Sequence, residues 1–139
     1  MPRLFTGLEI PSDVRQSLSI LRGGLPGARW IDPKVTRQAL EEIVRRLRGR
    51  GIAVLLAGMR AAPNLGPDYA RDFEAIYSDL AARNDLLLYP FFLDGVATDA
   101  KLNQRDGLHP TAAGVDAIVA RILPKAEELV ARARAKRGM

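Results

Sequence analysis

Residues 50–60 read RGIAVLLAGMR, and the apolar run inside this stretch, IAVLLAGM (52–59), decides the class of fold. A run of eight residues is far shorter than the roughly 20 that a helix needs to span a bilayer. It suits a strand that is buried on both faces of a parallel sheet. The preceding residues, VTRQALEEIVRRLRGR (35–50), carry apolar side chains at helical spacing, and Gly51 is a plausible stop. The stretch therefore predicts a helix followed by a buried strand.

The alternation of helix and strand continues toward the C-terminus. DYARDFEAIYSDLAAR (68–83) predicts an amphipathic helix whose inward face consists of Phe73, Ile76, Tyr77 and Leu80. LLLYPFF (86–92) is a second strand candidate that Pro90 interrupts. A long loop then leads to a helix that we expect Thr111 to cap and Pro124 to kink or break. This order predicts an α/β fold, with three α/β/α layers around a short, mostly parallel sheet.

The first thirty residues add weaker signals of the same kind. RLFTGLEI (3–10) alternates and is β-prone, and Ser12 fits the N-cap of a helix that ends at Gly23-Gly24. ARWI (28–31) is a further short strand candidate. With these segments included, we expect three or four strands in one compact domain.

The amino-acid composition limits which kinds of protein and which kinds of functional site are possible. With 139 residues, 47% hydrophobic and 27% charged, the chain fits a single globular domain and not a disordered one. It has no cysteine and one histidine, which excludes disulfides, thiol catalysis and multi-histidine metal sites. We therefore expect no cofactor and no metal. The N-terminus lacks a basic segment followed by an apolar stretch and a cleavage site, so the sequence predicts a cytoplasmic protein without membrane association.

The net charge of +5 raises the possibility of nucleic-acid binding. Its sources are RRLRGR (45–50) and ARARAKRG (131–138), which fit the solvated faces or ends of helices. No aromatic residue lies among them to stack on bases. The pattern favours solvated helix faces over a nucleic-acid partner.

The heptapeptide QRDGLHP (104–110) contains the single histidine, His109, three residues after Asp106. In such a step the carboxylate can hold the imidazole Nδ1–H, which fixes the tautomer and leaves Nε2 free to accept a proton. The same residues also fit a turn in which Asp106 begins the turn and His109 caps a helix. Taken alone, the short motif favours the turn, and the residues leave both interpretations open.

Other polar residues in the loops are weaker candidates. Asn64 follows the buried strand and could donate to an oxyanion, but a loop asparagine more often serves a turn. Asp94, Asp99 and Asp106 share one loop without the regular spacing and glycine of a calcium loop. This spacing argues against a metal site.

A larger pattern surrounds the heptapeptide. Residues from about 31 to 135 resemble the C-terminal half of an SGNH (GDSL-type) hydrolase. The residues that carry the resemblance are IDPKVTRQALEEIVRRLRGRGIAVLLAGMRAAPNLGPDYARDFEAIYSDLA (31–81) and LLLYPFFLDGVATDAKLNQRDGLHPTAAGVDAIVARILP (86–124). The resemblance is to the arylesterase, acyl-CoA thioesterase I and lysophospholipase kind. It implies a truncated, flavodoxin-like sheet, hydrolysis of a small acyl ester or thioester, and Asp106 and His109 as the acid and base of a triad.

The same resemblance implies that the site is incomplete. The family's nucleophile block, Gly-Asp-Ser, and its oxyanion block, Gly-x-Asn-Asp, do not occur in the sequence. The four serines, at positions 12, 17, 19 and 78, fall at a predicted helix cap or within predicted helices. A nucleophilic serine needs an exposed strand-to-helix turn. We therefore expect little or no ester hydrolysis.

The N-terminal segment (1–33) resembles another family, the RNA 2′,3′-cyclic phosphodiesterases of the 2′-5′ RNA ligase-like kind. That family works through two H-x-T/S motifs, which require two histidines, whereas this sequence has one. His109-Pro110-Thr111 fits the pattern once, and it lies outside the segment that resembles this family. The resemblance therefore implies that the segment shares ancestry with this family, but not that the chain has its phosphodiesterase activity. A crossover at Ile31-Asp32-Pro33 would make the chain a chimera of 1–33 and 34–139 that folds as one domain.

Loss of the first half of a hydrolase domain would remove central strands and leave an open sheet edge. Open edges invite association. We therefore expect either strand 3–10 to add to this edge, or a homo-oligomer that forms through it. The second outcome includes a non-catalytic domain whose property is self-association.

Overall fold

A computed structural model describes residues 31–62, 65–107 and 109–136. In this part of the chain the elements follow the order α2 (Pro33–Gly49), β1 (Leu55–Ala57), α3 (Pro67–Asn84), β2 (Leu87–Tyr89) and α4 (Ala112–Lys136). The strand expected over residues 3–10, the helix expected after Ser12 and most of the strand expected over 28–31 lie outside the described residues, as does Asn64.

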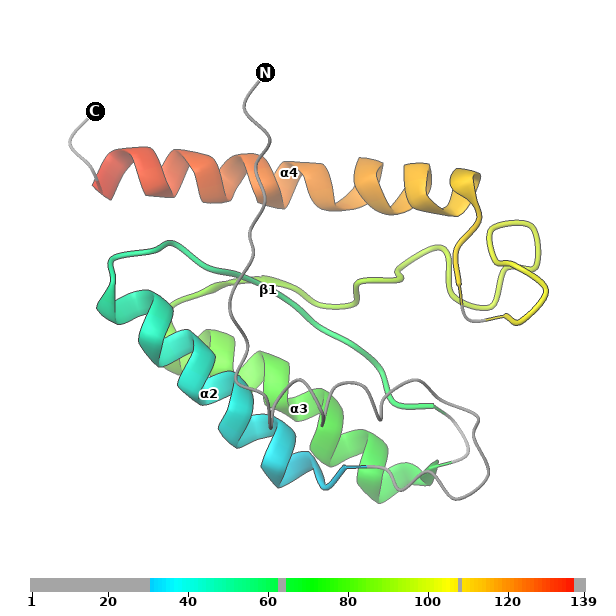
Figure 1. The fold of residues 1–139 in the computed structure, drawn as a ribbon, viewed down its shortest axis with the longest axis horizontal. Helices are drawn as coiled ribbons and strands as arrows, with labels where there is room; N and C mark the ends of the chain where they lie inside the picture. Colours follow the sequence, from blue (N-terminus) through cyan, green and yellow to red (C-terminus); the bar gives the residue numbers. More distant parts are fainter. Residues whose placement is uncertain (1–30, 63–64, 108, 137–139) are drawn as a thin grey trace.

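The sheet of the described region contains two parallel strands. Leu55 pairs with Leu87, Leu56 with Leu88, and Ala57 with Tyr89. Helices α2 and α3 cover one face of this sheet and α4 covers the other (Figure 1). This arrangement confirms the prediction of an α/β fold with three layers, and both strands are shorter than the apolar runs that contain them.

Helix α2 begins and ends where the local sequence requires. The side chain of Asp32 caps the helix by accepting a hydrogen bond of 2.8 Å from the backbone N–H of Lys34. Pro33 occupies the first turn, where its missing N–H costs nothing. Gly51, with φ +72°, follows the last turn and supplies the left-handed backbone that ends many helices.

The core lies between α3 and the sheet. Ile76 and Leu80 are almost completely buried, and they pack with Leu56 of β1 and, at the edge of the cluster, Leu40 of α2. The inward face that the sequence predicts for α3 is confirmed, since its four members are all buried: Phe73, Ile76, Tyr77 and Leu80. Amphipathic periodicity therefore placed this helix correctly on the sheet.

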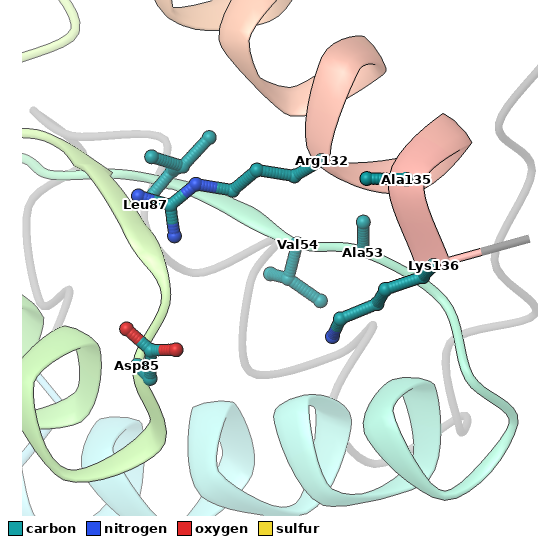
Figure 2. Close-up of a pocket in the computed structure, with 7 residues that line it drawn as sticks. All are labelled: Ala53, Val54, Asp85, Leu87, Arg132, Ala135 and Lys136. Atoms are coloured by element: carbon teal, nitrogen blue, oxygen red, sulfur yellow. The ribbon is translucent and has the colours of Figure 1, made fainter. Parts of the chain in front are cut away.

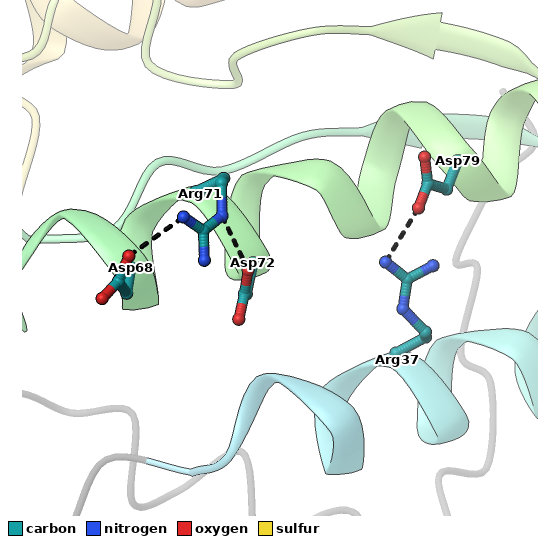
Figure 3. A network of polar contacts seen from close by, with 5 residues as sticks. All are labelled: Arg37, Asp68, Arg71, Asp72 and Asp79. Atoms are coloured by element: carbon teal, nitrogen blue, oxygen red, sulfur yellow. Dashed lines mark hydrogen bonds and ion pairs between the residues drawn. The ribbon is translucent and has the colours of Figure 1, made fainter.

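Polar side chains on α2 and α3 form ion pairs at the outer surface (Figure 3). Arg71 lies between Asp68, at 2.9 Å, and Asp72, at 3.1 Å, all on α3. Arg37 of α2 reaches Asp79 of α3 at 2.9 Å and so links the two helices. Exposed pairs within one helix add little stability, whereas the part-buried Arg37–Asp79 pair directly connects the two helices.

Pro124 does not break the last helix. Helix α4 continues through it for 25 residues, so the expected break is wrong. Both Pro124 and Ala120, whose carbonyl loses its helical partner, are exposed. Water can therefore hydrogen-bond this carbonyl, which lowers the cost of proline within the helix.

No helix in the described ranges is long and apolar enough to cross a membrane.

Burial of Tyr77 makes stability sensitive to alkaline pH. Desolvation raises the pKa of its phenol to about 12, with a smaller contribution from Tyr69. An unfolded tyrosine ionises near pH 10, so between about pH 10 and 12 the unfolded state loses a proton that the folded state keeps. The stabilising effect of the neutral phenol is therefore present below pH 10 and declines up to pH 12.

We expect Tyr77→Phe to flatten this alkaline decline in the free energy of unfolding. Urea titrations between pH 8 and 12, followed by circular dichroism, measure the slope. Tyr89→Phe is the comparison: the pKa of Tyr89 is also raised, but less than that of Tyr77, so this variant should flatten the decline less. An equal slope in Tyr77→Phe and the unmodified chain would contradict the assignment to Tyr77.

Candidate active site

The loop between β2 and α4 is closed by a buried asparagine. The Asn103 side-chain amide donates to the carbonyls of Val96, at 2.6 Å, and Asp99, at 2.8 Å. Asn103 also forms an antiparallel bridge with Pro110, and the backbone N–H of Gln104 donates to the carbonyl of His109 at 2.7 Å. These contacts hold residues 103–110 as a narrow, closed loop.

Asp106 and His109 meet within this loop through two contacts. One carboxylate oxygen of Asp106 accepts from the backbone N–H of His109 at 3.0 Å. The other lies 2.6 Å from the ring Nδ1. Gly107 has φ +68°, a left-handed backbone that suits the tight turn between the two residues. The carboxylate therefore fixes both the backbone and the ring of His109.

The contact leaves the imidazole in a form suited to accepting a proton. In the neutral ring, a proton on Nδ1 directed at the carboxylate leaves the lone pair of Nε2 unused by Asp106. The two side chains are exposed, with 71% of the His109 side chain and 44% of the Asp106 side chain accessible. The pair is thus oriented and open to solvent, and a reacting group can approach it.

Helix α4 is capped by Thr111 and not by His109. The Thr111 hydroxyl accepts from the backbone N–H of Gly114 at 3.2 Å, which confirms the predicted cap and contradicts the alternative in which His109 caps the helix. Gly114 lies so close to the loop that a Cβ there would be 2.2 Å from the carbonyl oxygen of Leu102. The first turn of α4 is therefore in direct contact with the loop that carries Asp106 and His109.

The remaining loop candidates do not converge on this pair. Asp94 makes an ion pair with Arg121 of α4 at 2.8 Å, and Asp99 accepts from the backbone N–H of Lys101 at 2.8 Å in a local turn. Among the described residues, no three histidine, cysteine or acidic side chains are grouped as a metal site would require.

Ser78 is the serine within the described ranges, and it lies on α3. Its hydroxyl donates to the carbonyl of Ala75 at 3.3 Å, one turn earlier in the same helix. Ser12, Ser17 and Ser19 lie outside the described residues. Ser78 is therefore bound to its own helix, as its predicted helical position implies.

The sequence did not predict a hollow at the opposite end of the strands (Figure 2). It has a volume of about 200 Å³, and Arg132 and Lys136 of α4 extend over it toward Asp85. The other lining residues are apolar: Ala53, Val54, Leu87 and Ala135. It lies where the strands begin, whereas Asp106 and His109 follow their carboxyl ends. Its members come from three separate segments, which no local motif joins.

Comparison with known proteins identifies the family of this fold. The model of the GDSL-like lipase/acylhydrolase family matches residues 18–117. The chain is 34% identical over 108 residues to the esterase TesA of Pseudomonas aeruginosa, which covers 78% of this chain and 54% of the relative. It is 36% identical over 88 residues to thioesterase 1/protease 1/lysophospholipase L1 of Escherichia coli, covering 63% of this chain and 42% of the relative.

Solved structures agree with this assignment. The crystal structure of TesA superposes with a TM-score of 0.66 at 32% identity, over 81% of this chain and 59% of that one. The esterase AlinE4, of the SGNH-hydrolase family, superposes with a TM-score of 0.55 at 42% identity, over 79% of this chain and 55% of that one. The chain spans about half the length of the curated relatives that it matches. By fold and by sequence, the chain belongs to the GDSL-like lipase/acylhydrolase family.

Proposed function

We propose that this chain carries the acid–base part of an ester-hydrolysis site, with His109 as the base and Asp106 as the residue that orients it. The observation that carries this proposal is the 2.6 Å contact between the Asp106 carboxylate and the His109 Nδ1, in an exposed loop. Relatives named as esterase and thioesterase support a small acyl ester or thioester as the substrate class.

The chemistry assigned to the pair is proton transfer. Nε2 of His109 takes the proton from an attacking O–H group, and the Asp106 carboxylate stabilises the imidazolium that forms. The proton then passes to the leaving alcohol or thiol. This cycle also requires a positioned hydroxyl and donors to the oxyanion, which the family provides through Gly-Asp-Ser and Gly-x-Asn-Asp.

The sequence contains neither block, and we therefore propose that the chain alone hydrolyses esters feebly. A serine hydrolase that loses one triad residue keeps about 10³–10⁴-fold catalysis over water, largely from the oxyanion hole and substrate binding. Without the oxyanion donors, the rate should fall well below this range.

Hydrolysis of p-nitrophenyl acetate tests the proposal. We expect a small rate above buffer, reduced further in His109→Ala and in Asp106→Asn, because a solvent-exposed oriented imidazole is still a weak base and nucleophile. Lys101→Ala, an exposed change in the same loop, is the matched control and should leave this rate unchanged.

The possible outcomes separate the two parts of the proposal. A large turnover that is lost in His109→Ala would contradict the expected feeble activity while supporting the role of the pair. A rate that is the same in His109→Ala and the unmodified chain would overturn the role of His109.

We also propose that the chain is a chimera whose first segment derives from the RNA 2′,3′-cyclic phosphodiesterase family. The resemblance of MPRLFTGLEIPSDVRQSLSILRGGLPGARWIDP (1–33) supports this origin, although the hydrolase-family match begins at residue 18, within that segment. Two complete parent genes side by side in the source genome would support a natural deletion. Their absence from any such neighbourhood would count against it.

A further inference from the structure

We propose that the edge of β1 that faces away from β2 and an apolar stripe on α4 together form a docking face for a second copy of this chain. The stripe consists of Val115, Val119, Leu123 and Val130, whose exposed fractions lie between 48% and 52%. In a helix that packs on a sheet, four such residues in one row are an unusual apolar surface.

The four residues share one side of α4. At 3.6 residues per turn they fall within an arc of about 80° around the helix axis. Val115 and Val119 each directly follow a buried residue, Gly114 and Ile118 respectively. The stripe is therefore displaced by roughly 100° from the side of α4 that packs on the sheet. It flanks the buried side and is not part of it.

The handedness of the helix places the stripe on the side of β1 and not of β2. In Figure 1, α4 runs from its yellow N-terminal end at the right to its red C-terminal end at the left, with the sheet below it. Along a right-handed helix, each residue is rotated by about 100° from the one before it. With α4 running in this direction, a residue that directly follows one facing the sheet therefore points toward the viewer. β1 lies nearer the viewer than β2, as a right-handed β1–α3–β2 connection requires. The stripe thus lies on the β1 side.

On that side, β1 has no paired strand among the described residues, since its ladder there is formed with β2. A two-fold axis perpendicular to the sheet would pair Leu55–Ala57 with the same strand of a second copy, antiparallel to it. Paired strands lie about 4.8 Å apart. Because α4 lies over both strands, the same axis would place the two α4 helices about 8–10 Å apart, the ordinary packing distance of helices.

The stripe is complementary to itself in this antiparallel arrangement. With the axis passing near Pro124, Val119 faces Val130 of the second copy and Leu123 faces Ala126. Asp116, near one end, faces Arg134, near the other. Both are exposed, and within one chain they lie 18 residues apart, about 27 Å along the helix. A charge pair between them forms only between two chains, which favours a second copy over an unrelated partner.

Sedimentation and light scattering over a concentration series test the docking face. The unmodified chain should reach twice its mass of 15.2 kDa. Leu123→Glu should raise the dissociation constant of this dimer by roughly 100-fold, because each interface would contain the buried carboxylate twice. Ala135→Glu, an exposed change about 155° around α4 from the middle of the stripe, is the control and should leave the dimer intact. Circular dichroism checks that each variant is folded.

A charge exchange identifies the pairing. Asp116→Arg should weaken the dimer about tenfold, and the double variant Asp116→Arg/Arg134→Asp should restore it. A monomer at all concentrations, a dimer unaffected by Leu123→Glu, or a failure of the double variant to restore association would each overturn the proposal. Protection of 3–10 from hydrogen exchange in a monomer would also overturn it by showing an intramolecular occupant. These residues lie outside the Asp106–His109 loop, so the result is independent of ester hydrolysis.

Discussion

Replacing Ile76 with alanine is expected to lower the free energy of unfolding by about 2–5 kcal/mol. Ile76 is completely buried at the centre of the cluster between α3 and the sheet. Alanine would leave a cavity among Leu56, Leu80 and their neighbours, and close-packed side chains fill such a cavity only partly. For a small domain this loss is a large fraction of the total stability.

Urea denaturation followed by circular dichroism measures this effect. Val35→Ala is the matched control, because Val35 lies on α2 with about half of its surface exposed. Its replacement should cost less than about 1 kcal/mol. Equal losses in the two variants would show that Ile76 is not at the centre of the core.

The second large effect is expected from Gly58→Ala. A Cβ at this position would lie 2.2 Å from the carbonyl oxygen of Pro90. The backbone cannot move away easily, because the N–H of Gly58 donates to Tyr89 and its carbonyl accepts from Phe92, both at 2.8 Å. We expect a loss of at least about 2 kcal/mol, in the range of overpacked cores.

Gly49→Ala provides a control with the same chemical change. No atom lies within 4 Å of a Cβ built on Gly49, near the end of α2. Alanine is a better helix former than glycine, so this variant should be as stable as the unmodified chain or up to about 1 kcal/mol more stable. A Gly58→Ala variant with unchanged stability would show that β1 and the segment after β2 do not approach as closely as described.

The parts of the fold that local patterns determine could be predicted from the sequence. Helices α2 and α3 follow from apolar spacing, and Gly51 marks the end of α2 as predicted. The approach of Asp106 to His109 also depends on a turn of three residues, which the motif itself contains. The family resemblance then favoured catalysis over a simple turn, a distinction that the short motif did not settle.

Features that depend on packing between distant segments could not be predicted in this way. The apolar runs around β1 and β2 extend beyond their paired residues, because strand length is set by the neighbouring strand. Pro124 continues α4 because its side of the helix faces water, which the sequence does not reveal. The hollow beside Arg132 and Lys136 joins three segments. The side of α4 on which its stripe lies depends on the direction of the helix over the sheet.

The orientation of His109 by Asp106 is the central claim, and the ring nitrogens report it directly. With one histidine in the chain, ¹⁵N-detected long-range NMR correlations give an unambiguous spectrum of the neutral imidazole. We predict the tautomer with the proton on Nδ1 and an unprotonated Nε2, and we expect Asp106→Asn to shift this balance. A neutral ring protonated mainly on Nε2, with the same spectrum in Asp106→Asn, would contradict it.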